Sequence, residues 1–167
     1  PVVESYARKL GGPERAQQII DHVTRIAAGE GLEFRMDRAL RDNTLMAHRL
    51  LWLAGATGNQ HALKERLLQA YFHDGLDVGD PEVLVQCAVD VSIDADAVRG
   101  FLASADGADA VRADIERAQE LEITAVPTYV FTIPGREQGW VVPGAQDSEV
   151  FVQVLRRLEA KAQAADG

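Results

Sequence analysis

Residues 122–131 read EITAVPTYVF, and this stretch says more about the fold than any other in the chain. The residues before it recur at helical spacing, and those after Pro127 are β-branched or aromatic, as is typical of a strand. Proline has no backbone N–H to give to a sheet, so it is found at the first residue of a strand or on an edge. It also pushes the preceding residue, Val126, towards extended backbone. The stretch therefore predicts a helix end, a Val-Pro step and then a strand.

The residues that follow predict a hairpin and a final helix. Strands are expected over Tyr129–Ile133 and Trp140–Val142, on either side of a turn at Pro134 and Gly135. Asp147 is a suitable N-cap for the helix after them. The apolar residues of this helix share one face and are expected to be buried: Val150, Phe151, Val154, Leu155 and Leu158.

The residues before the stretch predict helices and one short strand. Pro13 follows two glycines and opens a helix. Leu32–Met36 alternates apolar and charged residues, which predicts a strand. Caps, prolines and helical spacing then predict helices over 45–54, after Asn59, over Pro81–Val91, over 95–103 after Asp94, and from Asp106 to Leu121. This order indicates an α/β unit that is interrupted by a helical insertion.

Composition and charge exclude several classes of function. The chain has 167 residues, enough for one compact domain or a domain with an insertion, and a net charge of -9. An acidic surface argues against nucleic acid or an anionic membrane as a partner. Four histidines and one cysteine give no metal-ligand spacing, and one cysteine cannot form an internal disulfide. The sequence shows neither a bilayer-spanning apolar run nor a signal peptide, so a cytoplasmic location is expected.

Five segments in order resemble DsbA-like oxidoreductases of the FrnE type. The resemblance covers nearly the whole chain, and five ordered segments are more specific than any one of them. The segments are NTLMAHRL at 43–50, ALKERL at 62–67 with AYF at 70–72, GDPEVL at 79–84, TAVPT at 124–128 and PGAQ at 143–146.

The resemblance implies a fold. It is a thioredoxin-like α/β fold of the DsbA family with a large helical insertion, and this chain is expected to be predominantly helical. Residues 1–43 are then a partial thioredoxin-like segment and connection, 44–121 the insertion, and 122–167 the C-terminal part of the thioredoxin-like domain. Distant relatives in this group are 2-hydroxychromene-2-carboxylate isomerases and kappa-class glutathione transferases. Family members begin with a strand, a C-x-x-C motif at a helix start and another strand, and this sequence is expected to begin after them.

The resemblance also implies an activity, thiol–disulfide exchange, and a substrate site. Val126, a cis Pro127 and Thr128 would face the substrate, joined by Asn43 and His48. No residue of this chain is expected to be catalytic or to bind a metal, and no cofactor is expected, although glutathione is an option. The expected partners are thiol or disulfide proteins, or a glutathione-like substrate. Two alternatives remain: a glutathione-dependent isomerase or transferase, and a non-catalytic binding module.

Simpler explanations exist for several of these residues. Asn43 and Thr44 are suited to cap the helix that follows them, and His48 is expected to be packed or hydrogen-bonded. Cys87 lies in mid-helix among apolar residues, which predicts a buried, inert thiol. Glu122 stands where the family usually has glycine, and a positive φ there would cost about 1 kcal/mol.

The strand after Pro127 has a consequence for assembly. If the sheet is incomplete, the Tyr129–Ile133 strand keeps an open edge, which invites pairing with a second chain. A homodimer is therefore expected. The alternative is a monomer in which Leu32–Met36 folds back as an added strand.

Overall fold

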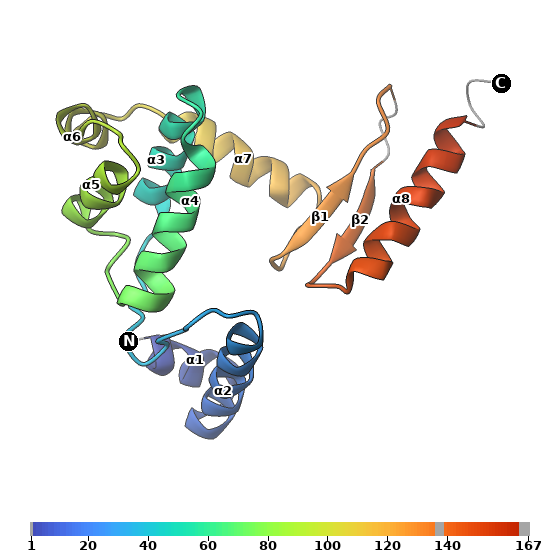
Figure 1. Cartoon of the computed structure of the whole chain (residues 1–167), viewed down its shortest axis with the longest axis horizontal. Coiled ribbons are helices and arrows are strands. Elements are labelled where there is room, and N and C mark those ends of the chain that lie inside the picture. The colour runs from blue at the N-terminus through green and yellow to red at the C-terminus, as the bar shows by residue number, and fades with distance from the viewer. Residues whose placement is uncertain (1, 136–138, 164–167) are drawn as a thin grey trace. The chain divides into compact units, whose positions relative to one another are not determined.

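The computed structural model describes residues 2–135 and 139–163, and these residues are mainly helical (Figure 1). Their contacts group into two compact units, Pro1–Asp114 and Ile115–Gly167. The three-segment division expected from the sequence remains a prediction.

Within the described residues of the first unit, all the regular elements are helices. They begin where the sequence offers caps and prolines, and turns separate them. In chain order they are α1 (Val2–Leu10), α2 (Pro13–Gly29), α3 (Leu45–Ala56), α4 (Gln60–Gln69), the π-helical turn η1 (Ala70–Asp74), α5 (Pro81–Asp90), α6 (Ala95–Ala103) and the first part of α7 (Ala108–Glu120).

Two of these starts show how the sequence sets the helix boundaries. The Asp80 side chain accepts the N–H of Glu82 at 2.8 Å, directly before the proline that opens α5. The Asp94 side chain accepts the N–H of Ala97 at 2.8 Å at the start of α6. Each carboxylate satisfies one of the N–H groups that a helix start leaves without a partner. Both predicted helices are confirmed.

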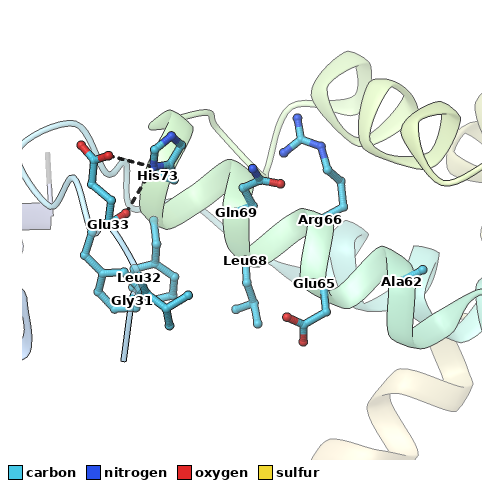
Figure 2. Close-up of a pocket in the computed structure, with 11 residues that line it drawn as sticks. Gly31, Leu32, Glu33, Ala62, Glu65, Arg66, Leu68, Gln69 and His73 are labelled. Carbon is cyan, nitrogen blue, oxygen red and sulfur yellow. Dashed lines mark hydrogen bonds and ion pairs between the residues drawn. The ribbon is translucent and has the colours of Figure 1, made fainter. Parts of the chain in front are cut away.

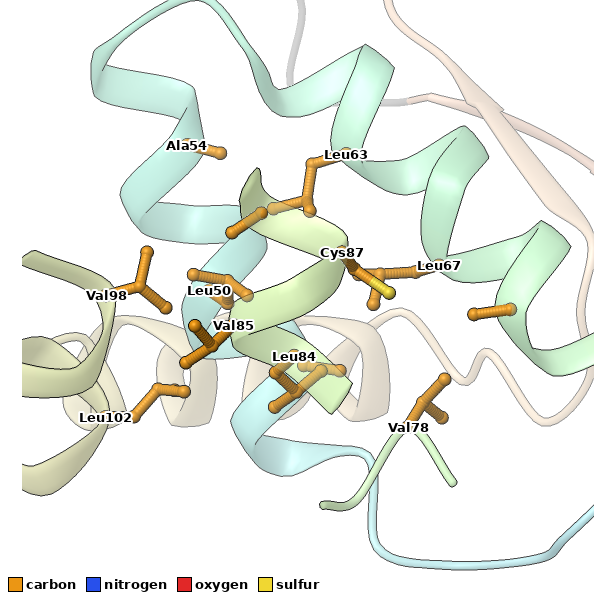
Figure 3. Packing of buried hydrophobic residues seen from close by; sticks show 13 residues of the cluster. Leu50, Ala54, Leu63, Leu67, Val78, Leu84, Val85, Cys87, Val98 and Leu102 are labelled. Carbon is orange, nitrogen blue, oxygen red and sulfur yellow. The ribbon is translucent and has the colours of Figure 1, made fainter. Parts of the chain in front are cut away.

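The main hydrophobic core of the first unit lies between α3, α4, α5 and α6. Figure 3 shows the buried side chains converging from these helices. The largest fully buried ones are Leu50, Leu63, Leu84, Val98 and Cys87. Together with their buried neighbours, these side chains form one continuous cluster that links the four helices.

The buried Arg49 joins the α6–α7 connection to α3. Its guanidinium donates to the carbonyl oxygens of Phe101, Ser104 and Asp106 at 3.1, 2.8 and 2.9 Å. It also lies 5.2 Å from the centroid of the Phe101 ring. The charge is therefore buried with its donors satisfied.

A second cluster packs the N-terminal helices against the 34–39 segment. Its buried members are Ile20, Met36 and Ala39, and Phe34 stacks on Phe72 at 4.3 Å between ring centroids. The predicted strand at 32–36 is wrong, because these residues form a loop and a turn. Two of its three alternating apolar side chains, Phe34 and Met36, pack on this cluster, whereas Leu32 is 55% exposed.

The second unit holds the hairpin and the last helix. Strands β1 (Thr128–Phe131) and β2 (Trp140–Pro143) pair antiparallel. The Tyr129 and Phe131 rings lie 4.7 and 6.4 Å from the Phe151 ring of α8 (Ser148–Gln163), so one face of the hairpin packs on this helix. The hairpin and the helix are confirmed within a residue or two of the predicted bounds.

The predicted buried face of α8 is only partly buried. Leu158 is buried and Phe151 is half-buried, but Leu155 is 53% exposed. The prediction for Leu155 is therefore wrong. The two described strands are narrower than the apolar face of the helix, so they cannot cover all of it.

Candidate substrate-binding loop at Val126 and Pro127

The loop begins with a well-formed end to α7. The N–H of Ile123 donates to the carbonyl of Ala118, and the N–H of Glu122 to that of Gln119, both at 2.9 Å. This is the hydrogen-bond pattern of a Schellman motif, in which the residue after the helix takes a positive φ. Glu122 takes this conformation, with a φ of 54°, at a position where the resemblance indicates that glycine is usual.

Val126 projects from a loop that is held at both ends. The Val126–Pro127 peptide bond is cis, as expected from the resemblance. The carbonyl of Pro127 accepts the N–H of Gly144 at 2.8 Å, and the hydroxyl of Thr128 donates to the carbonyl of Ala125 at 2.7 Å. Val126 itself is 90% exposed. The loop thus presents an apolar residue to solvent on a fixed backbone.

The Gly144 contact joins two segments that the sequence shows separately. TAVPT at 124–128 and PGAQ at 143–146 meet where the carbonyl of Pro127 accepts from Gly144. The Gln146 side chain donates to the carbonyl of Pro143 at 2.8 Å and so fixes the second turn. Residues 123–128 carry no ionisable side chain. They can bind a ligand by shape and by backbone hydrogen bonds, but they hold no thiol for disulfide exchange.

Asn43 and His48 belong to the first unit, at the start of α3. The Asn43 side chain accepts the N–H of Leu45 at 2.9 Å, which supports the capping explanation. Thr44 makes no such cap bond with its side chain. His48 is exposed, so the expectation of a packed histidine is wrong. It lies on the solvent side of α3, away from the face that buries Ala47 and its neighbours. A substrate role for Asn43 or His48 stays a prediction.

The single cysteine is unsuited to redox chemistry. Cys87 is fully buried in α5. Burial raises the pKa of its thiol, and the smaller opposing effect comes from the nearby charge of Arg66. A nucleophilic cysteine needs exposure and a lowered pKa. The predicted burial of this thiol is confirmed, and its inertness stays a prediction. Within the described residues, no three His, Cys, Asp or Glu side chains gather as they would around a metal ion.

Sequence reasoning missed one further feature, a groove of about 660 Å³ in the first unit. It lies between residues 31–34 and the α4–η1 segment. Periodicity could not reveal it, because the π-helical turn that forms one wall leaves no local sequence pattern. The apolar Phe34 and Phe72 were the available signal.

Comparison with known proteins gives the family. Residues 1–156 match the family described as the DSBA-like thioredoxin domain. The crystal structure of a probable DsbA oxidoreductase from Streptomyces coelicolor is similar, with 38% identity and a TM-score of 0.83, over 94% of this chain and 66% of that one. A putative protein disulfide isomerase from Nitrosomonas europaea has the same fold, with 17% identity and a TM-score of 0.72, over 89% of this chain and 76% of that one.

Curated relatives match over a shorter range. YwbO of Bacillus subtilis is 29% identical over 102 residues, which are 60% of this chain and 48% of that protein. The ClpXP adapter protein SpxH of Bacillus cereus is 34% identical over 95 residues, 56% of this chain and 32% of that protein. The matched part is thus less than half of either relative.

Two sequence expectations can now be assessed. The DsbA-like thioredoxin fold with a mainly helical chain is confirmed by the family match and the structural similarity. No helix in the described ranges combines the length and the apolarity needed to span a bilayer. The chain belongs to the DSBA-like thioredoxin domain family.

Proposed function

We propose that this chain provides substrate binding for a thiol–disulfide oxidoreductase of the FrnE type. The observation that carries the proposal is the loop at Val126, where a 90% exposed apolar residue precedes Pro127. The loop backbone is fixed through Gly144 and Thr128, so a ligand would meet a preorganised surface. The ligand class is an extended peptide or a glutathione-like molecule that carries a disulfide.

The sulfur chemistry is assigned to thiols outside this sequence. In the exchange reaction, a thiolate attacks one sulfur of a disulfide, the S–S bond breaks, and the other sulfur leaves as a thiolate. Cys87 is buried, and its pKa is raised by burial, so it cannot take the attacking role. We therefore expect the chain alone to be inactive in an insulin reduction assay. Turnover that Cys87→Ser abolishes would overturn this assignment.

Binding can be tested on the isotope-labelled chain by NMR titration. The probe is a short extended peptide whose central cysteine is joined to glutathione by a disulfide. The amides of 123–128 and 143–146 are expected to shift. Val126→Asp should weaken binding at least several-fold, whereas Val152→Asp, at an exposed valine of α8, should not. Equal binding by parent and Val126→Asp, or shifts confined to other residues, would contradict the proposal.

A second candidate function is a non-catalytic binding module. Two observations favour it: the single buried cysteine, and relatives from several Bacillus strains whose name is ClpXP adapter protein. The same titration separates the two functions. A module that binds protein segments for their shape should bind the peptide equally well when serine replaces its central cysteine and no glutathione is attached. A disulfide-directed site should lose affinity for that peptide.

A further inference from the structure

The groove beside α4 has the size of a ligand site. Its volume of about 660 Å³ lies within the range of small-molecule pockets, roughly 300–1,000 Å³. Figure 2 shows the residues that line it, which come from the 31–34 loop, α4 and η1. All of them belong to the first unit, so the groove does not depend on the loop at Val126.

The π-helical turn is an independent sign that this place has a function. π-helical residues are well under 1% of residues in soluble proteins, and single π turns occur frequently at functional sites. Here η1 carries Phe72 and His73, and both side chains line the groove. The carbonyl of Phe72 accepts the N–H of Arg35 at 2.6 Å, so the two walls are tied together through the backbone.

The lining is apolar on the side where a ligand body would lie. The Phe34 and Phe72 rings stack at 4.3 Å with an interplanar angle of 11°. Leu32 and Leu68 line the same groove and are 55% and 44% exposed. Large apolar side chains at this exposure, next to a stacked aromatic pair, are suited to cover the apolar part of a ligand.

The charge at the groove favours a cation. Glu65 and Leu68 point to one side of α4 and Arg66 to the other (Figure 2). Arg66 is already neutralised, because it pairs with Asp74 at 2.9 Å and with Asp90 at 2.7 Å. Glu65 has an exposed pair with Lys64 at 3.1 Å, a type of contact that contributes little and exchanges easily.

A second carboxylate reinforces this preference. Glu33 lies at the other end of the groove, where its Oε2 is 3.8 Å and its carbonyl oxygen 3.3 Å from Nδ1 of His73. Its Oε1 is also 3.6 Å from Nη1 of Arg35, in an exposed pair that contributes as little as the one between Glu65 and Lys64. The chain as a whole has a net charge of -9, which adds long-range attraction for cations.

We infer that this groove binds an organic cation with an apolar body, such as an aryl-alkyl amine. The apolar part would lie on Leu68, Leu32 and the Phe34–Phe72 pair, and the ammonium group would meet the carboxylate of Glu65. This inference is independent of the thiol–disulfide function proposed above.

Three small probes of nearly equal size test the inference on the isotope-labelled full chain. They are 2-phenylethylamine, which is a cation at pH 7, neutral 2-phenylethanol and anionic phenylacetate. In an NMR titration at low salt, the amine should shift the amides of 31–34 and 62–73. We expect it to bind about fivefold to tenfold more tightly than the alcohol, with phenylacetate weakest. Equal binding of the three probes, shifts confined to other residues, or no binding by the amine would overturn the inference.

Two exposed positions allow variants that leave the fold intact. Glu65→Gln should remove most of the preference for the amine over the alcohol. The control is Glu82→Gln, at an exposed carboxylate of α5 that is likewise paired, with Arg99 at 3.1 Å. Leu68→Gln should weaken the binding of the amine and of the alcohol by similar factors. A preference for the amine that survives in Glu65→Gln would show that the assigned carboxylate is wrong and would refute the inference.

Discussion

The two units differ in how well each covers its own apolar surface. In the first unit, thirteen buried residues form one cluster between four helices. In the second, Leu158 is the one buried hydrophobic side chain among the described residues, while Val130, Val141 and Leu155 are 37%, 50% and 53% exposed. Helices can close a core on all sides, whereas a two-stranded hairpin with one helix covers one face of the sheet. Burial thus depends on the number of packed layers more than on how apolar a segment is.

Each unit has its own spectroscopic reporter for testing this difference. The chain has two tryptophans, Trp52 in α3 and Trp140 in β2. Trp140→Phe leaves a reporter for the first unit, and Trp52→Phe leaves one for the second. Urea unfolding of these two backgrounds gives the free energy of unfolding for each unit.

The largest effect is expected from a cavity in the helical core. Leu84→Ala, at a residue with no exposed surface, should lower the free energy of unfolding reported by Trp52 by about 3 kcal/mol. The matched change in the second unit, Leu155→Ala, should cost below about 1 kcal/mol at the Trp140 reporter, because this side chain is already half exposed. Equal losses at the two positions would contradict the contrast between the units.

The next effect concerns the buried charge of the first unit. Arg49→Met leaves the carbonyls of Phe101, Ser104 and Asp106 without their donor, and should cost about 2–3 kcal/mol in urea unfolding. Arg112→Met, at an exposed arginine paired with Asp109, is the control and should change stability by less than about 0.5 kcal/mol. A loss at Arg49 no larger than that of the control would show that its hydrogen bonds do not stabilise the unit.

The third prediction tests the uncovered face of the second unit. Val130 and Val141 pair across the hairpin on the side away from Phe151. We expect this face and the free edge of β1 to join two chains into a homodimer. Val130→Lys should weaken that association about tenfold or more in light scattering over a range of concentrations. The control is Val89→Lys, at an exposed valine of α5. A concentration-independent monomeric mass of the parent chain would contradict the expectation.

The fourth prediction is a gain in stability at the end of α7. Glu122 has a φ of 54°, a conformation that costs a side-chain-bearing residue roughly 1–2 kcal/mol and glycine little. Glu122→Gly should therefore raise the stability reported by Trp140 by about 1 kcal/mol. Glu116→Gly, inside the same helix, should lower it by about 1 kcal/mol. If both changes raised or both lowered the free energy of unfolding, the result would contradict the assignment of a strained, positive φ to Glu122 in the Schellman motif.

The smallest effect is a dependence on pH in the first unit. Hydrogen bonds from Arg66 and then Gln86 lower the pKa of the Asp90 carboxyl below its usual value. The folded state therefore gains stability from Asp90 above the usual pKa and loses it as the pH falls through the lowered pKa. The parent should exceed Asp90→Asn in urea stability at pH 7, and the difference should disappear in acid.

Two results would argue against this effect. One is a difference between the parent and Asp90→Asn that stays constant from pH 7 down to strong acid. The other is an equal loss in Asp114→Asn, a control at an exposed position of α7.

Local sequence predicted the features that depend on neighbouring residues. Pro81 and Asp94 marked helix starts correctly, because proline and capping residues act within the first turn of a helix. The sequence resemblance predicted the cis bond before Pro127. The family usually has glycine at position 122, which indicated that Glu122 could take a positive φ.

Predictions that depend on distant partners failed. The alternation at 32–36 gave no information about whether a strand lay beside it, and the segment packs on α2 and η1 instead. Leu155 was expected to be buried and His48 to be packed because of their places on predicted helices. A helical pattern identifies a face of the helix but not what covers it. The groove could not be predicted either, because its two walls are about thirty residues or more apart in the chain.

The π-helical turn also limits how the chain length can vary. η1 closes its backbone hydrogen bonds one residue later than an α-helix does, as in the bond from the N–H of Gly75 to the carbonyl of Ala70. Deleting one residue here would let the α-helix of α4 continue without interruption. Everything after the deletion would then turn by about 100° around the helix axis. Phe72 would leave Phe34 although neither residue had been substituted, so insertions and deletions are more disruptive at 70–74 than most substitutions.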